Sequence, residues 1–93
     1  MLGDRIREIR QSRGMSQVEL GKRIGVSKQS ISNWENENIQ PSIDMLIRIA
    51  KVFSVTTDYL LSLDTRNFIE VKNLSLLEIS HIQQLIDDLS KLK

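Results

Sequence analysis

The chain contains no cysteine and a single histidine, His81. Without thiols it cannot form a disulfide, a thiolate metal site or a cysteine nucleophile, and one imidazole cannot build a zinc site alone. No apolar run approaches the roughly 18 residues that a bilayer-spanning helix needs. The first residues, MLGDRIREIR, carry charge where a signal peptide would be apolar. These absences predict a cytoplasmic protein that uses no metal or cofactor and has no membrane partner.

Proline, glycine and aromatic residues are also scarce: there is one proline, there are four glycines, and aromatic side chains make up 4% of the chain. Such a composition disfavours a sheet-rich fold and favours short helices. The 93 residues, 40% of them hydrophobic, fit one small domain with a short appendage. No glycine-rich phosphate loop or paired carboxylate spacing is present, so we expect no enzymatic activity. The net charge of +1 neither favours nor excludes nucleic acid.

The first 62 residues carry signals for five helices. Leu2, Ile6 and Ile9 recur at helical spacing, which predicts a first helix that ends near Gly14. Ser16, three residues before Glu19, forms a capping box that begins the second helix.

A tight turn then joins the second helix to the third. Gly25 is a left-handed stop, and Ser27 is a good N-cap for a third helix that extends through Asn36. Gly21 allows the two helices to approach closely. The apolar positions that such a helix-turn-helix requires are filled by Leu20, Ile24, Val26, Ile31 and Trp34.

Two more helices complete the unit. Pro41 and Ser42 mark the start of the fourth helix, with Ile43 and Ile47 outside its apolar stripe. We expect that stripe to consist of Leu46, Ile49, Ala50 and Phe53. The fifth helix is expected to have Thr57 as its cap and a buried side formed by Tyr59, Leu60 and Leu61.

The C-terminal third has a different organisation. The globular unit is expected to span 1–62, and residues 63–74 lack a helical period, which predicts a linker or extended arm. Ser75 and Glu78 form a second capping box, so a final helix should occupy the 75–93 segment, with a length of roughly 27 Å from Leu76 to Lys93. Its apolar stripe is too wide for a free helix and comprises Ile79, Ile82, Leu85, Ile86, Leu89 and Leu92. We expect the stripe to pair with a second copy, in preference to packing within the chain.

The ordered motifs of residues 2–61 resemble the phage repressor and Cro-like helix-turn-helix family, also called the Xre family. The resemblance is carried by IREIRQSRGMSQVELGKRIGVSKQSISNWEN, the pair Pro41–Ser42, and VTTDYLL. It implies an all-α, five-helix DNA-binding domain of a transcriptional regulator, more often a repressor, on two-fold operators. One departure is Glu37, which stands where the family usually has glycine. We therefore expect Asn36 or Asn38 to take the positive φ in that loop.

The polar face of the third helix, within residues 28–36, is the candidate base-reading surface. Helical period turns Ile31 and Trp34 inward and leaves polar side chains outward. Gln and Asn can pair with adenine in the major groove, Lys can bond guanine, and Ser can bond either. The expected base-reading residues are Lys28, Gln29, Ser32 and Asn33.

Phosphate contacts are expected around the start of the second helix. The free amides and positive end of that helix attract a phosphate, to which Gln17 can add its side-chain amide. The resemblance likewise implies that Gln17 is a phosphate anchor. The supplementary contacts we expect are Arg13, Lys22, Arg23, Ser27 and Asn36.

Arg10 and Glu35 are expected to be structural. They can meet as a partly buried bidentate pair that fixes the orientation of the third helix, and the resemblance implies such a pair. The predicted partners are a double-stranded DNA operator and a second copy of the chain. The alternative is an antitoxin or antagonist-controlled adaptor whose C-terminal helix binds a different protein, such as a toxin or antagonist.

Overall fold

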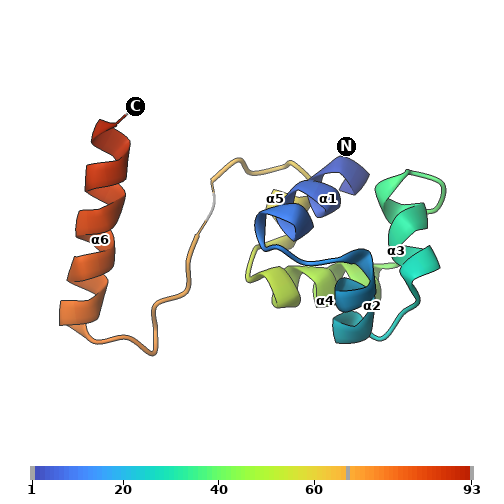
Figure 1. Cartoon of the computed structure of the whole chain (residues 1–93), viewed down its shortest axis with the longest axis horizontal. Coiled ribbons are helices and arrows are strands. Elements are labelled where there is room, and N and C mark those ends of the chain that lie inside the picture. The colour runs from blue at the N-terminus through green and yellow to red at the C-terminus, as the bar shows by residue number, and fades with distance from the viewer. Residues whose placement is uncertain (1, 67, 93) are drawn as a thin grey trace.

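The computed structural model of the chain describes residues 2–66 and 68–92. Its helices are α1 (Leu2–Ser12), α2 (Gln17–Ile24), α3 (Lys28–Glu35), α4 (Ile43–Phe53), α5 (Thr57–Leu60) and α6 (Leu76–Lys91). Figure 1 shows α1 to α5 gathered into one unit, with α6 at the end of an extended segment. The predicted all-α fold is confirmed. Within the described ranges no helix is both long and apolar enough to cross a membrane.

Short polar side chains begin the helices that follow α1. The hydroxyls of Ser16, Ser27, Ser42 and Ser75 each accept a hydrogen bond from the backbone amide three residues later. At Ser16 and Ser75 the reciprocal bond from a glutamate completes the predicted capping box. These bonds satisfy amides that a helix cannot pair within itself, which is why the helices begin at these residues.

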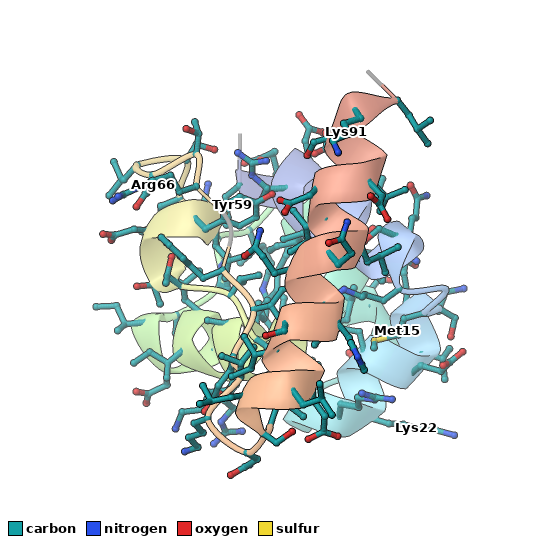
Figure 2. All side chains as sticks on the ribbon, turned by 90° about the vertical axis from the view of Figure 1, so that its left-hand side faces the viewer. Met15, Lys22, Tyr59, Arg66 and Lys91 are labelled. Atoms are coloured by element: carbon teal, nitrogen blue, oxygen red, sulfur yellow. The ribbon has the colours of Figure 1, made fainter. Side chains whose placement is uncertain are left out.

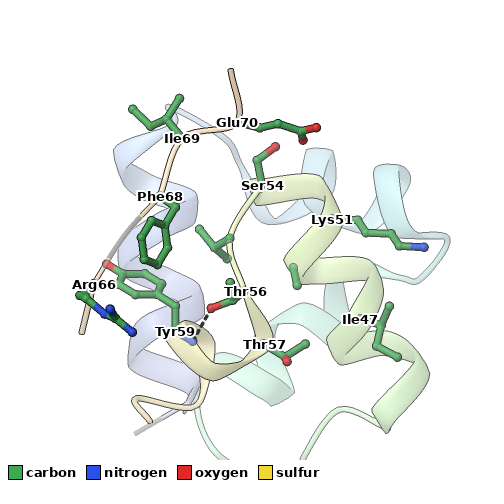
Figure 3. A pocket seen from close by; sticks show the side chains of 12 residues that line it. Ile47, Lys51, Ser54, Thr56, Thr57, Tyr59, Arg66, Phe68, Ile69 and Glu70 are labelled. Carbon is green, nitrogen blue, oxygen red and sulfur yellow. Dashed lines mark hydrogen bonds between the residues drawn. The ribbon is translucent and has the colours of Figure 1, made fainter. Parts of the chain in front are cut away.

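The predicted cap and buried side of α5 were wrong in part. The cap is Thr56, whose hydroxyl accepts the amide of Tyr59 at 3.0 Å, whereas Thr57 is the first helical residue (Figure 3). Only Leu60 is buried, while Tyr59 is half-buried and Leu61 is 42% exposed. A single turn of helix presents one side chain squarely to the core, and Leu61 lies beyond its end.

The core lies entirely within α1 to α5 and the loop after α1. Its fully covered centre includes Ile6, Leu20, Ile31, Ile49 and Phe53. Of the predicted α4 stripe, Leu46 is only half-buried, whereas Ile43 and Ile47 are exposed as expected. No residue of α6 is buried.

The loop after α3 differs from the sequence expectation. Glu37 itself has φ 61°, and Asn36 has φ −90°. The Asn38 amide donates to the Asn33 carbonyl at 2.9 Å and the Glu37 amide to the Trp34 carbonyl at 3.2 Å. This Schellman pattern requires a left-handed residue directly after the C-cap, and that position belongs to Glu37 whatever its side chain.

The Glu37 side chain ties this loop to the start of α1. Its carboxylate accepts the backbone amide of Gly3 at 2.6 Å, a donor that α1 cannot satisfy internally. A Cβ on Gly3 would lie 2.5 Å from the Trp34 carbonyl oxygen and 2.6 Å from that of Glu35. Only glycine therefore lets α1 approach the end of α3 this closely.

The described part of the 63–75 segment contains no helix, and part of it crosses the domain. Figure 3 shows Phe68, Ile69 and Glu70 running past α5 and the end of α4. Together with Ile47 and Tyr59, these residues line an open groove of about 460 Å³.

A buried ion pair between α1 and α3 sets the orientation of α3. The Arg10 guanidinium donates from Nε to Glu35 Oε2 at 2.7 Å and from Nη2 to Oε1 at 2.9 Å. Its Nη1 also donates to the Met15 carbonyl at 2.8 Å. Charge-assisted bidentate bonds of this kind constrain both direction and distance.

The pKa of the Glu35 carboxyl is lowered by this network. Burial alone would raise that pKa, but hydrogen bonds from Arg10 and Gln17, with the charges of Arg10 and Arg7, outweigh burial. Glu35 is therefore ionised at neutral pH, where it accepts from α1 and α2 together.

Replacing Arg10 by methionine should destabilise the protein because the buried Glu35 carboxylate would lose its bidentate partner. Breaking a buried pair on one side costs about 3 to 5 kcal/mol, to be measured as the free energy of unfolding in urea. The matched control is Arg66→Met, because the Arg66 side chain is 76% exposed in its pair with Asp64, so the cost should stay below about 1 kcal/mol. Equal effects of the two variants would contradict a structural role for Arg10.

Stability should depend on pH through Glu35. Because its folded-state pKa is lowered from 4.5, its contribution is complete above that value and is lost as pH falls through the folded pKa. Urea unfolding of the parent and of Glu35→Gln should be measured from pH 7 to pH 3. The parent should lose stability more steeply below about pH 4.5, and parallel curves would refute the assignment.

Candidate nucleic-acid interface

The turn between α2 and α3 is set by two glycines. Gly25 ends α2 at φ 83°, a left-handed conformation that glycine adopts freely. A Cβ on Gly21 would lie 2.6 Å from the carbonyl oxygen of Val26, so α2 and the turn meet in backbone contact. Ser27 then caps α3, which follows α2 after only three residues.

The polar side of α3 carries the four predicted base-reading residues. Lys28 and Gln29 are exposed, and Ser32 and Asn33 are half-buried. Gln29 Nε2 donates to Asn33 Oδ1 at 3.1 Å along one face of the helix. The pair retains the Gln29 carbonyl and the Asn33 amino group for other partners, so this face offers both donors and acceptors.

Gln17 lies in the first turn of α2, where its orientation is set by Glu35. Gln17 Nε2 donates to Glu35 Oε1 at 3.1 Å. An ionised carboxylate only accepts, so the amino group of Gln17 must face it, and the second N–H of that group remains to donate. The unpaired amides at the start of α2 lie beside it, and together these groups can hold an anion.

The other predicted phosphate ligands occupy different environments. Lys22 and Arg23 are exposed in the last turn of α2, and the Ser27 hydroxyl serves as the α3 cap. Asn36 lies at the C-cap of α3 in a side-chain network. Arg13 instead donates to the Phe53 carbonyl at 2.9 Å, which places its guanidinium at the end of α4.

Two arginines that contact the ends of α2 and α3 were not predicted from the sequence. Arg7 donates to Asn36 Oδ1 at 2.8 Å and to the Glu35 carbonyl at 3.3 Å. Arg48 donates to the Ile24 carbonyl at 3.1 Å and so caps the end of α2. Arg7 lies three residues before Arg10 on the same helical face, a spacing that could have indicated it; Arg48 has no comparable local signal.

The stripe predicted on α6 is largely uncovered. Ile79 and Ile82 are half-buried, whereas Leu85 is 58%, Leu89 is 51% and Leu92 is 82% exposed. Figure 2 looks along the horizontal axis of Figure 1, so that α6 is seen from the side with its side chains extending around it. A helix with this much exposed leucine and isoleucine presents an apolar surface suited to association.

Known proteins resemble this chain in both sequence and fold. The helix-turn-helix family matches residues 6–60. The HTH-type transcriptional regulator ImmR of Bacillus subtilis is 32% identical over 90 residues, which span 94% of this chain and 69% of ImmR.

Solved structures extend the comparison. The P22 c2 repressor bound to a synthetic operator is 38% identical with a TM-score of 0.65, over 69% of this chain and 97% of that one. The complex of the proteins SinR and SinI matches at 26% identity and a TM-score of 0.65, over 92% of this chain and 79% of that one. The chain therefore belongs to the helix-turn-helix family of transcriptional regulators.

Proposed function

We propose that the protein represses transcription by reading a double-stranded DNA operator in the major groove with α3. The observation that carries this proposal is the polar face of α3, which the buried Glu35 carboxylate holds against α1 through Arg10 and against α2 through Gln17. Lys28, Gln29, Ser32 and Asn33 are the proposed base-reading residues. The similarity to an operator-bound repressor supports the same placement.

Backbone phosphates would fix the register of α3 on the duplex. Gln17 and the amides of the first turn of α2 form the proposed anchor, because they are uncharged donors already aimed together. Lys22, Arg23, Ser27 and Asn36 would add contacts around it. Arg13 is the weakest member of this set because its guanidinium is engaged at Phe53.

Selection of bound sites from random duplex DNA tests this function directly. The expected result is one enriched sequence with two symmetric half-sites, and reduced transcription in vitro from a promoter that carries it. Binding without sequence enrichment would contradict base reading. We expect this activity to be exercised in the cytoplasm.

We further propose that α6 joins two copies into the operator-binding dimer. Its uncovered stripe offers each copy the same apolar face, as a two-fold contact requires. Two α3 helices could then enter successive major grooves about 34 Å apart. A foreign protein antagonist is the competing occupant, since a complex of two different proteins also resembles this chain.

Gln29→Ala should remove discrimination at one base pair of the selected site. A bidentate contact of glutamine with adenine is worth about 1 to 3 kcal/mol, measured as relative affinity for single-base variants of the site. Binding to unrelated DNA should barely change. The control is Gln84→Ala, which removes a glutamine side chain from α6, outside the proposed base-reading face. If the ranking of site variants survives in Gln29→Ala, this residue does not read bases.

The double variant Ile82→Asp with Leu89→Asp should convert the protein to a monomer because it places two charges in the proposed seam. Sedimentation reports the mass, and binding to the full operator should weaken through loss of linkage between half-sites. Ser80→Asp with Gln84→Asp adds the same charges to the opposite face and should leave the dimer intact. A monomeric parent at operator-binding concentrations would reject self-pairing and point to a foreign partner.

A further inference from the structure

Arg7 has contacts that the proposed function leaves unexplained. Its side chain is 37% exposed and projects from α1 to the C-terminal end of α3. There Nη2 donates to Asn36 Oδ1 at 2.8 Å and to the Glu35 carbonyl at 3.3 Å, while Nε lies 3.5 Å from Glu35 Oε1. One guanidinium therefore holds the last turn of α3 at three points.

These contacts set the orientation of the Asn36 amide. A guanidinium carries only donors, so the oxygen of Asn36 must face Arg7. The amino group of Asn36 then faces Ser32, and Nδ2 donates to Ser32 Oγ at 3.3 Å. Without Arg7, the two ends of the amide could exchange places with little change in shape.

The oriented Asn36 amide in turn constrains the hydroxyl of Ser32. Because the Ser32 oxygen accepts from Asn36, its proton is free of that contact and can be donated elsewhere. Ser32 is half-buried on the polar side of α3, between the exposed Gln29 and the C-cap Asn36. A hydroxyl donor in the major groove pairs with base acceptors, namely guanine N7 or O6, adenine N7 and thymine O4.

We propose that Arg7 is a positioning residue for sequence readout, which sets Ser32 as a donor to a base acceptor by orienting Asn36. The inference rests on the proposed placement of α3 in the major groove. Because Arg7 acts on the base through Asn36 and Ser32, its replacement should change discrimination at one base pair, in addition to any uniform change from the proposed phosphate contact of Asn36. A direct contact of Arg7 with a phosphate would instead change affinity equally on all sequences.

The first experiment uses the full chain and the site that it selects from random DNA. Relative affinities for all single-base variants are measured for Arg7→Lys, Ser32→Ala and the double variant. Lysine retains the charge but cannot form the forked contacts of a guanidinium. Arg7→Lys and Ser32→Ala should each lose about 3- to 10-fold discrimination at the same base pair. The double variant should lose no more than Ser32→Ala alone.

Arg5→Lys is the matched control. Arg5 lies on the same helix, but its guanidinium covers the Tyr59 ring at 4.6 Å and donates to Ser62. Its replacement should leave the ranking of site variants unchanged. A ranking altered equally by Arg5→Lys and Arg7→Lys would overturn the specific role of Arg7.

A second variant tests whether the Ser32 hydroxyl donates to the base or accepts from it. In Asn36→Asp the new carboxylate can accept from both Arg7 and the Ser32 hydroxyl, which turns Ser32 from a donor into an acceptor toward the base. The preference at the affected base pair should move about 3- to 10-fold toward the donors of adenine N6 or cytosine N4. In the Ser32→Ala background the same substitution should leave that preference unchanged.

Three outcomes would overturn the inference. They are an unchanged ranking of site variants in Arg7→Lys, additive losses in the double variant, and an unchanged base preference in Asn36→Asp. None of these outcomes contradicts the proposed function, because each is measured on a site that the parent protein has selected. A parent that enriches no sequence overturns both proposals together.

Discussion

The buried ion pair between Arg10 and Glu35 is the constraint on which the placement of α3, with its proposed base-reading face, depends. Glu35 accepts from Arg10 on α1 and from Gln17 on α2, while its own backbone belongs to α3. A single ionised carboxylate thus joins the three helices that build the interface. Because the charge is buried, removing one partner of this pair costs far more free energy of unfolding than removing one partner of an exposed pair.

A second attachment of α3 to α1 lies in the loop directly after Glu35. Glu37, in a left-handed conformation, returns its carboxylate to the Gly3 amide, and Arg7 spans the same junction from α1. A left-handed residue other than glycine costs free energy of order 1 to 2 kcal/mol, which the bond to Gly3 helps offset. Both attachments to α1 therefore lie at the C-terminal end of α3.

Local signals explain what could be predicted from the sequence. The cap at Ser16 and the stop at Gly25 depend on neighbours within one turn, so residue type alone reveals them. The positive φ was misassigned because hydrogen-bond position, not side-chain preference, selects Glu37. Contacts such as Arg7 with Asn36 join residues 29 positions apart, and only the packed fold brings them together.

The absence of any α6 residue from the core has a consequence for how such a chain can evolve. The domain of α1 to α5 closes its apolar centre without α6, so substitutions along α6 carry little penalty in folding stability. Under the proposed roles, substitutions in α6 would change association while they leave the polar face of α3 intact. A duplicated gene could acquire a new association partner while it retains its ancestral target sequence.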